Sequence, residues 1–124
     1  MIERFITVML LIIGVIHLLP LSGSLDAERL SALYGLNISE PNLEILMRHR
    51  AVLFGLLGGF FVYAAFKHDL QNIAFVAAFV SVGSFFYLAF SVGGHNDAMG
   101  RVITADCIAA ACLVVAVTLS TLAK

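Results

Sequence analysis

Charge is scarce in this sequence of 124 residues. Asp, Glu, Lys and Arg make up 12% of the chain, against roughly 25% in a typical soluble domain. Hydrophobic residues make up 61%, and the mean hydropathy is +1.03. These proportions exclude a disordered chain and argue against a soluble globular domain. The net charge of −1 gives no indication of a nucleic-acid partner.

Familiar catalytic and metal-binding motifs are also lacking. The sequence has no HExxH, no nucleophile motif and no recognised zinc spacing among its histidines. Its two cysteines, Cys107 and Cys112, are separated by roughly 140° around a helix, since each residue turns ~100°. They cannot easily bridge each other, and we interpret them as small apolar residues. Whether the protein is an enzyme stays open at this stage.

The sequence does contain four long apolar runs. Their uncharged stretches are Phe5–Leu25, Ala51–Phe66, Leu70–Asn96 and Val102–Ala123, the last interrupted by Asp106. A helix needs about 20 apolar residues to cross the hydrocarbon layer. We therefore predict a single all-α membrane domain over residues 1–124, a bundle of four transmembrane helices spanning about 2–19, 42–67, 73–92 and 102–122. As an alternative, Arg4, the apolar stretch after it and Ser22-Gly23-Ser24 resemble a signal peptide.

The segment between the first two spans has its own pattern. Asp26–Leu36 predicts a short interfacial helix between helices 1 and 2, because Leu30, Leu33 and Tyr34 share one side and Gly35 can end it. Ser39 is the expected N-cap of the second span. A loop is expected at residues 95–100. In the second span, the glycines are expected to allow close helix packing; they are Gly55, Gly58 and Gly59.

Four spans place both termini and the 67–72 loop on one side of the membrane. Arg4, Lys67 and Lys124 lie on that side, and Arg29, Arg48, Arg50 and Arg101 lie on the other. When the last three arginines are assigned to a site rather than to loops, the positive-inside rule places both termini in the cytoplasm.

The polar residues of the spans gather at one end of the predicted bundle, although they come from four stretches of sequence. A charged group in the bilayer costs about 2.5–3.5 kcal/mol on insertion scales, so such groups usually face the bundle interior and have a partner. We therefore take the cluster as a candidate ligand-binding site. Its members are His17, Arg48, His49, Arg50, Tyr87, His95, Arg101 and Asp106.

Helix periodicity assigns faces to these residues. Arg50 shares a stripe with Leu43, Leu46, Met47 and Phe54, so it should point inward. We expect Arg50 to be the ionic partner of Asp106, and Arg101 is the second candidate for that role. Arg48 is four residues from Glu44 and is expected to form a surface ion pair. The third span carries a polar stripe that should face the interior or a wet cavity, formed by Ser84, Tyr87, Ser91 and His95.

Guanidinium groups suit phosphate, carboxylate or sulfate oxygens, and apolar walls near the interface suit an amphiphile. The leading hypothesis is therefore a site for an anionic or quinone-like amphiphile, such as a membrane lipid, with catalysis open. A second hypothesis is an accessory or structural subunit in which an Arg–Asp pair only sets helix register. A third is an electron-transfer subunit with haem between His17 and His95. A homo-oligomer or a larger membrane complex is compatible with each.

Three segments resemble the DoxX-like group of small four-helix bacterial membrane proteins. They are Gly14-Val15-Ile16-His17-Leu18, the stretch MRHRAVLFG from Met47 to Gly55, and Gly93-Gly94-His95-Asn96. The resemblance implies a four-helix bundle in the bacterial inner membrane, in a branch apart from the founding members. Some members of that group are linked to quinone-coupled sulfur oxidation, but no catalytic residue can be carried over to this chain.

Overall fold

The computed structural model describes residues 1–123, apart from the side chain of Ser24. Within these residues every regular element is helical, and four helices are long and apolar enough to cross a membrane. This confirms the four predicted spans. Lys124, one of the charges counted for the topology, lies outside the described residues. The elements are α1 (Ile2–Leu18), η1 (Leu19–Ser24), α2 (Ala27–Tyr34), α3 (Pro41–Ala65), η2 (His68–Leu70), α4 (Gln71–Val92) and α5 (Asp97–Leu122).

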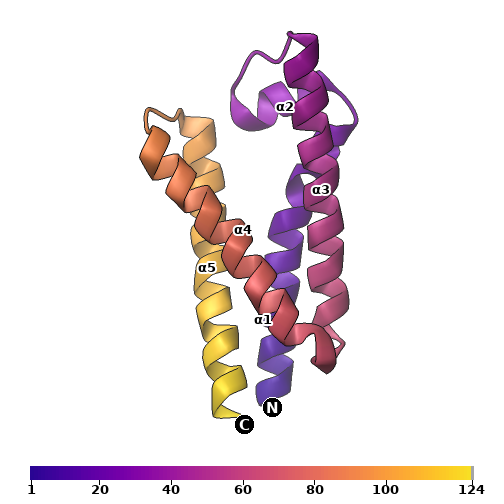
Figure 1. Cartoon of the computed structure of the whole chain (residues 1–124), viewed down its shortest axis with the longest axis vertical. Helices are drawn as coiled ribbons and strands as arrows, with labels where there is room; N and C mark the ends of the chain where they lie inside the picture. Colours follow the sequence, from indigo (N-terminus) through magenta and orange to yellow (C-terminus); the bar gives the residue numbers. More distant parts are fainter. Residues whose placement is uncertain (124) are drawn as a thin grey trace.

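The four long helices run up and down in sequence order (Figure 1). α1 packs against α3 and α5, and α4 packs mainly against α5. α4 crosses the front of the bundle from the lower end of α3 to the upper end of α5 (Figure 1). The chain ends and η2 lie at one end of the molecule, and α2 and the α4–α5 turn lie at the other (Figure 1).

The core lies between α1 and its neighbours. Ile6, Leu10 and Ile13 from α1 pack with Phe61 from α3 and with small residues of α4 and α5. α1 is thus part of the bundle core, which favours a span over a signal peptide. The outer faces are apolar as well, and large side chains such as Phe79 and Phe90 are exposed. Apolar residues on both the inner and the outer faces are what a bilayer-spanning helix requires.

The short helix α2 has well-defined ends. The Asp26 side chain accepts a hydrogen bond from the Arg29 amide at 2.8 Å, which caps the helix start. Gly35 ends the helix with a φ of 65°, the left-handed conformation that glycine adopts without strain. A short helix between the first two spans, ended by Gly35, is therefore confirmed.

The start of α3 differs from the prediction. Glu40, and not Ser39, is the N-cap, and its carboxylate accepts hydrogen bonds from the amides of Asn42 at 3.0 Å and Leu43 at 2.9 Å. Pro41 follows at the first helical position. These two hydrogen bonds hold the pKa of the Glu40 carboxyl below its usual range.

α5 begins earlier than predicted. The Asn96 side chain accepts a hydrogen bond from the Met99 amide at 2.7 Å and caps a helix whose first residue is Asp97. The expected loop at residues 95–100 is therefore wrong for residues 97–100, because the Asn96 cap starts the helix at Asp97 and the helix continues through Gly100. Asp106 consequently lies roughly two and a half turns inside the helix.

The glycines of α3 have different surroundings. A Cβ on Gly58 would lie 2.8 Å from the Gly14 carbonyl oxygen, so this glycine lets the backbones of α1 and α3 approach closely. A Cβ on Gly55 would lie 2.5 Å from the Leu21 side chain. A Cβ on Gly59 would meet nothing within 4 Å. The packing prediction is confirmed for Gly58 and Gly55, and it is wrong for Gly59.

Candidate ligand-binding site

An inner cavity of about 160 Å³ lies at the end of the bundle that carries α2. Residues from α1, η1, α2, α3, α4 and α5 line it, and most of them are apolar. Its polar lining residues are His17, Tyr34, Arg50, Arg101 and Asp106. The structure thus brings together four of the residues predicted to form the site, and it adds Tyr34.

Arg50 is held in place by aromatic side chains. Its Nη1 donates a hydrogen bond to the Tyr34 hydroxyl at 2.6 Å. The centre of its guanidinium lies 4.5 Å from the centroid of the Phe54 ring and 5.4 Å from that of Tyr34, both within cation–π range. Arg50 faces inward as predicted, although Leu46 of the same predicted stripe is 67% exposed. The contacts fix the position of the cation and leave other N–H donors for a ligand.

Asp106 lines the same cavity from α5 and is half-buried. Among the described residues, no ion pair joins it to Arg50 or to Arg101. The charge of Arg50 acts on the Asp106 carboxyl, so the predicted partnership is present as a charge interaction but not as a direct ion pair. The direct partner of the guanidinium is the Tyr34 hydroxyl of α2, a contact that the positions of Arg50 and Asp106 on their helices could not reveal.

His17 is 2% exposed and makes a hydrogen bond at each ring nitrogen. Its Nδ1 lies 2.9 Å from the Ile13 carbonyl oxygen and its Nε2 lies 2.8 Å from the Ser81 hydroxyl. Because a carbonyl only accepts, Nδ1 carries a hydrogen, and Nε2 of the neutral ring accepts from Ser81. The Phe61 ring meets the imidazole edge-on at 4.9 Å between centroids.

These contacts do not fit the haem hypothesis. A haem ligand needs a free ring nitrogen, whereas both nitrogens of His17 are bonded within the protein. His95 is exposed in the α4–α5 turn and does not line the inner cavity. The structure therefore does not bring His17 and His95 together around one space.

His95 instead lines an outer groove of about 420 Å³. This groove lies between the α2–α3 side of the molecule and the α4–α5 turn, and its walls are largely apolar. Tyr34, Arg50 and Phe85 line both the outer groove and the inner cavity. The two spaces therefore lie on either side of these three residues.

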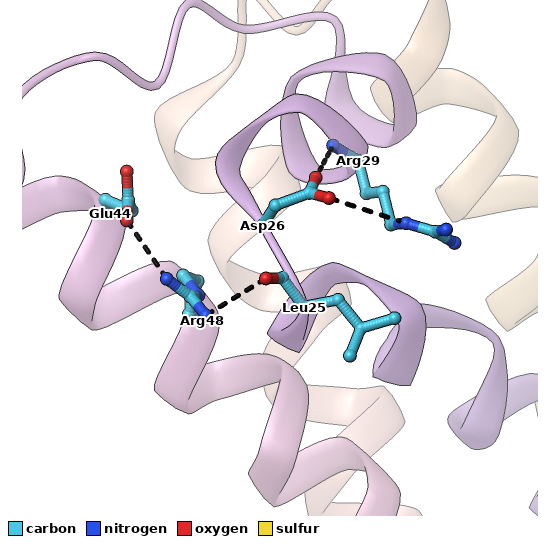
Figure 2. A network of polar contacts seen from close by, with 5 residues as sticks. All are labelled: Leu25, Asp26, Arg29, Glu44 and Arg48. Atoms are coloured by element: carbon cyan, nitrogen blue, oxygen red, sulfur yellow. Dashed lines mark hydrogen bonds and ion pairs between the residues drawn. The ribbon is translucent and has the colours of Figure 1, made fainter.

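Arg48 points away from both spaces. It donates one hydrogen bond to the Glu44 carboxylate at 3.1 Å and another to the Leu25 carbonyl at 3.0 Å. Figure 2 shows these contacts together with the Asp26–Arg29 pair at the start of α2. The predicted Glu44–Arg48 ion pair is confirmed. Arg48 ties α3 to the end of η1 rather than lining a cavity, and His49 beside it is exposed.

The polar stripe predicted on the third span does not face the interior. Tyr87 is 71% exposed, and Ser84 is exposed and donates back to the Ser81 carbonyl at 3.2 Å. Ser81 is the serine that reaches the bundle interior, at His17. Every face of α4 is rich in apolar residues, so its sequence does not reveal which way the helix is turned.

Sequence reasoning missed the role of Asn96 as well as that of Tyr34. Besides capping α5, the Asn96 amide donates to the carbonyl oxygens of Tyr34 at 3.0 Å and Gly35 at 3.2 Å. It thereby fastens the end of α2 to the start of α5. An Asn directly before a helix was a usable signal for the cap, but no sequence signal indicated the second contact.

No family model matches this chain, and comparisons with curated proteins and with solved structures find no match.

Proposed function

We propose that this protein is a multi-pass membrane protein that binds an amphiphile with an anionic head in the inner cavity. The observation that carries the proposal is the Arg50 guanidinium, fixed by Tyr34 and Phe54 at the wall of an otherwise largely apolar cavity. Arg101 adds a second cation to the lining and Asp106 adds one carboxylate. With His17 neutral, the lining has an excess of positive charge, which favours an anion.

Each polar residue has a role in this proposal. Arg50 binds the anionic head through its forked donors. Asp106 offsets one of the two arginine charges and orients the head. His17, bonded to Ser81, provides a neutral polar patch on the cavity wall. A quinone-like head is the second candidate, since its carbonyl oxygens could accept from Arg50, but it would leave the positive excess unmatched.

The setting of the protein is part of the same proposal. We place it in the bacterial inner membrane, on the resemblance of its motifs to DoxX-like proteins, with both termini in the cytoplasm. α2 lies at the membrane surface, because it buries Leu30 and Tyr34 against the bundle and exposes Glu28 and Arg29. An accessory subunit held in register by an Arg–Asp pair receives less support, since the direct hydrogen bond of Arg50 is to Tyr34 and no ion pair within contact distance joins Arg50 to Asp106 in the described residues.

Native mass spectrometry of the protein purified in a mild non-ionic detergent tests the proposal. We expect a bound anionic amphiphile on the wild type and on Arg29→Gln, which removes an exposed arginine remote from the cavity. Arg50→Gln should lose the bound mass while its thermal unfolding stays cooperative. A bare polypeptide in all three samples, or equal retention by Arg50→Gln, would contradict the proposal.

A further inference from the structure

The inner cavity and the outer groove share a wall formed by Tyr34, Arg50 and Phe85. This arrangement indicates which class of amphiphile the site binds. We propose that the ligand is a single-chain anionic amphiphile that enters from the bilayer, with its head in the inner cavity and its chain in the outer groove. This inference rests on the proposed function, because it assigns a ligand class to the same site.

The sizes of the two spaces support a division between head and chain. Small-molecule sites usually measure ~300–1,000 Å³, and the inner cavity, at about 160 Å³, is smaller than that. It can hold a compact head group but no long chain. The outer groove measures about 420 Å³, and the two together fall within the usual range for one small ligand. A two-chain phospholipid would require far more space.

The inner cavity has charged and polar residues in its lining, as a head group requires, and the outer groove has a largely apolar lining, as a chain requires. The inner cavity contains Arg101, Asp106 and His17, whereas the groove beyond Arg50 is lined by residues such as Leu88, Ala89, Val92 and Met99. Arg50 lines both spaces. A head bound to its guanidinium is therefore next to the groove from which an apolar chain can continue.

The groove also faces the side from which a membrane lipid would come. Leu36, Leu88 and Val92 line it and are exposed on the outer surface of the bundle. At this end of the bundle α4 has crossed away from α3 towards α5 (Figure 1), and residues of α4 such as Leu88, Ala89 and Val92 form one side of the groove. Tyr34 and Arg50, joined by a hydrogen bond, line both the groove and the cavity. A chain can thus remain in an apolar environment while its head reaches Arg50.

Binding of four defined probes to the detergent-solubilised full chain tests the inference. Dodecanoate has head and chain, acetate has only the head, dodecanol has only the chain, and dilauroyl phosphatidylglycerol has two chains. We expect dodecanoate to raise the melting temperature and to bind at least tenfold more tightly than the other three probes. Arg50→Gln should reduce dodecanoate binding at least tenfold.

Groove variants separate this inference from the proposed function. Ala89→Phe fills the groove, and Leu88→Trp adds bulk there at an exposed position that tolerates it. Ala111→Phe is the matched control, since Ala111 is exposed on α5 away from the groove. Both groove variants should weaken dodecanoate binding at least tenfold, and the control should not.

The outcomes are distinguishable. If acetate or the phospholipid binds as tightly as dodecanoate, or if neither groove variant weakens dodecanoate while Arg50→Gln does, the single-chain inference is overturned and the anion site stands. If Arg50→Gln binds every anionic probe as the wild type does, the proposed function itself fails, and the inference fails with it.

Discussion

The His17 imidazole joins α1 to α4 through the Ser81 hydroxyl, at a position that is 2% exposed. A buried polar atom that loses its partner keeps the full desolvation penalty, about 1–3 kcal/mol. We therefore expect Ser81→Ala to lower the free energy of unfolding by roughly this amount. Equilibrium unfolding in a defined detergent mixture measures the change.

Ser84→Ala is the control for that measurement, on the same helix. Its hydroxyl is exposed and bonds only to the backbone of its own helix, so we expect a change within ~0.5 kcal/mol. Equal effects of the two substitutions would mean that the His17–Ser81 hydrogen bond does not stabilise the bundle.

Single residues also show how far the site could be predicted. His17, Arg50, Arg101 and Asp106 were predictable, because ionisable side chains in apolar spans usually face the interior, and all of them line the inner cavity. Tyr34 was not, because its role depends on how α2 folds back onto α3. Arg50 and Asp106 interact through their charges but form no direct ion pair, since two residues on inward faces need not be nearest neighbours.

At the scale of the helices, α1 and α3 meet at a pair of glycines. A Cβ on Gly58 would lie 2.8 Å from a backbone oxygen of Gly14, which cannot move without shifting α1. We expect Gly58→Ala to destabilise the protein by about 1–3 kcal/mol through overpacking. Gly59→Ala should be neutral or stabilising by up to ~1 kcal/mol, because Ala favours helix and the added methyl meets open space.

Thermal melting of the two variants side by side checks this contrast. The substitutions are chemically identical and lie at adjacent positions, so a difference between them reports the helix contact alone. If Gly58→Ala melts at or above the temperature of Gly59→Ala, α1 and α3 do not approach as closely as the structure has them.

The Glu40 cap at the start of α3 should make the stability of the fold depend on pH. The amides of Asn42 and Leu43 lower the pKa of the Glu40 carboxyl in the folded protein, so its cap stabilises the fold at pH values above the unfolded value of about 4.3. That stabilisation is lost as the pH falls through the lower pKa of the folded state. We expect the melting temperature of the wild type to exceed that of Glu40→Gln at pH 7.

Melting curves of both proteins from pH 7 down to pH 3 measure this dependence. The difference between them should be constant above about pH 5 and should shrink below the unfolded pKa of ~4.3. A difference that stays constant to pH 3 would show that the Glu40 charge does not contribute to capping α3.

At the scale of the whole molecule, the number and order of the spans followed from hydropathy and length, because a fixed bilayer thickness demands a helix of about 20 residues. Hydropathy and length did not predict how each helix is rotated about its own axis. Where both the lipid-facing and the core-facing sides are apolar, hydropathy carries little information about which side packs inward. α4 is the clearest case, since the stripe of Ser84 and Tyr87 was expected inside and is exposed.

The proposed orientation in the membrane rests on the same placement of charges. Arg50 and Arg101 line the inner cavity and Arg48 is paired with Glu44, so these arginines do not act as free loop charges. Arg4 and Lys67 then remain at the end that carries the termini, and Arg29 remains at the other. With two cations against one, the positive-inside rule favours the proposed orientation, with the termini in the cytoplasm.

Single-cysteine labelling tests this orientation in spheroplasts. In a background with Cys107→Ala and Cys112→Ala, we introduce Asn37→Cys between α2 and α3, and Asp69→Cys in η2, both at exposed positions. A membrane-impermeant maleimide should label Asn37→Cys in intact spheroplasts and Asp69→Cys only after lysis. The reverse pattern would place the termini outside and the inner cavity near the cytoplasmic face. Labelling of both sites in intact spheroplasts would contradict an odd number of crossings between them, and with it the four-span topology.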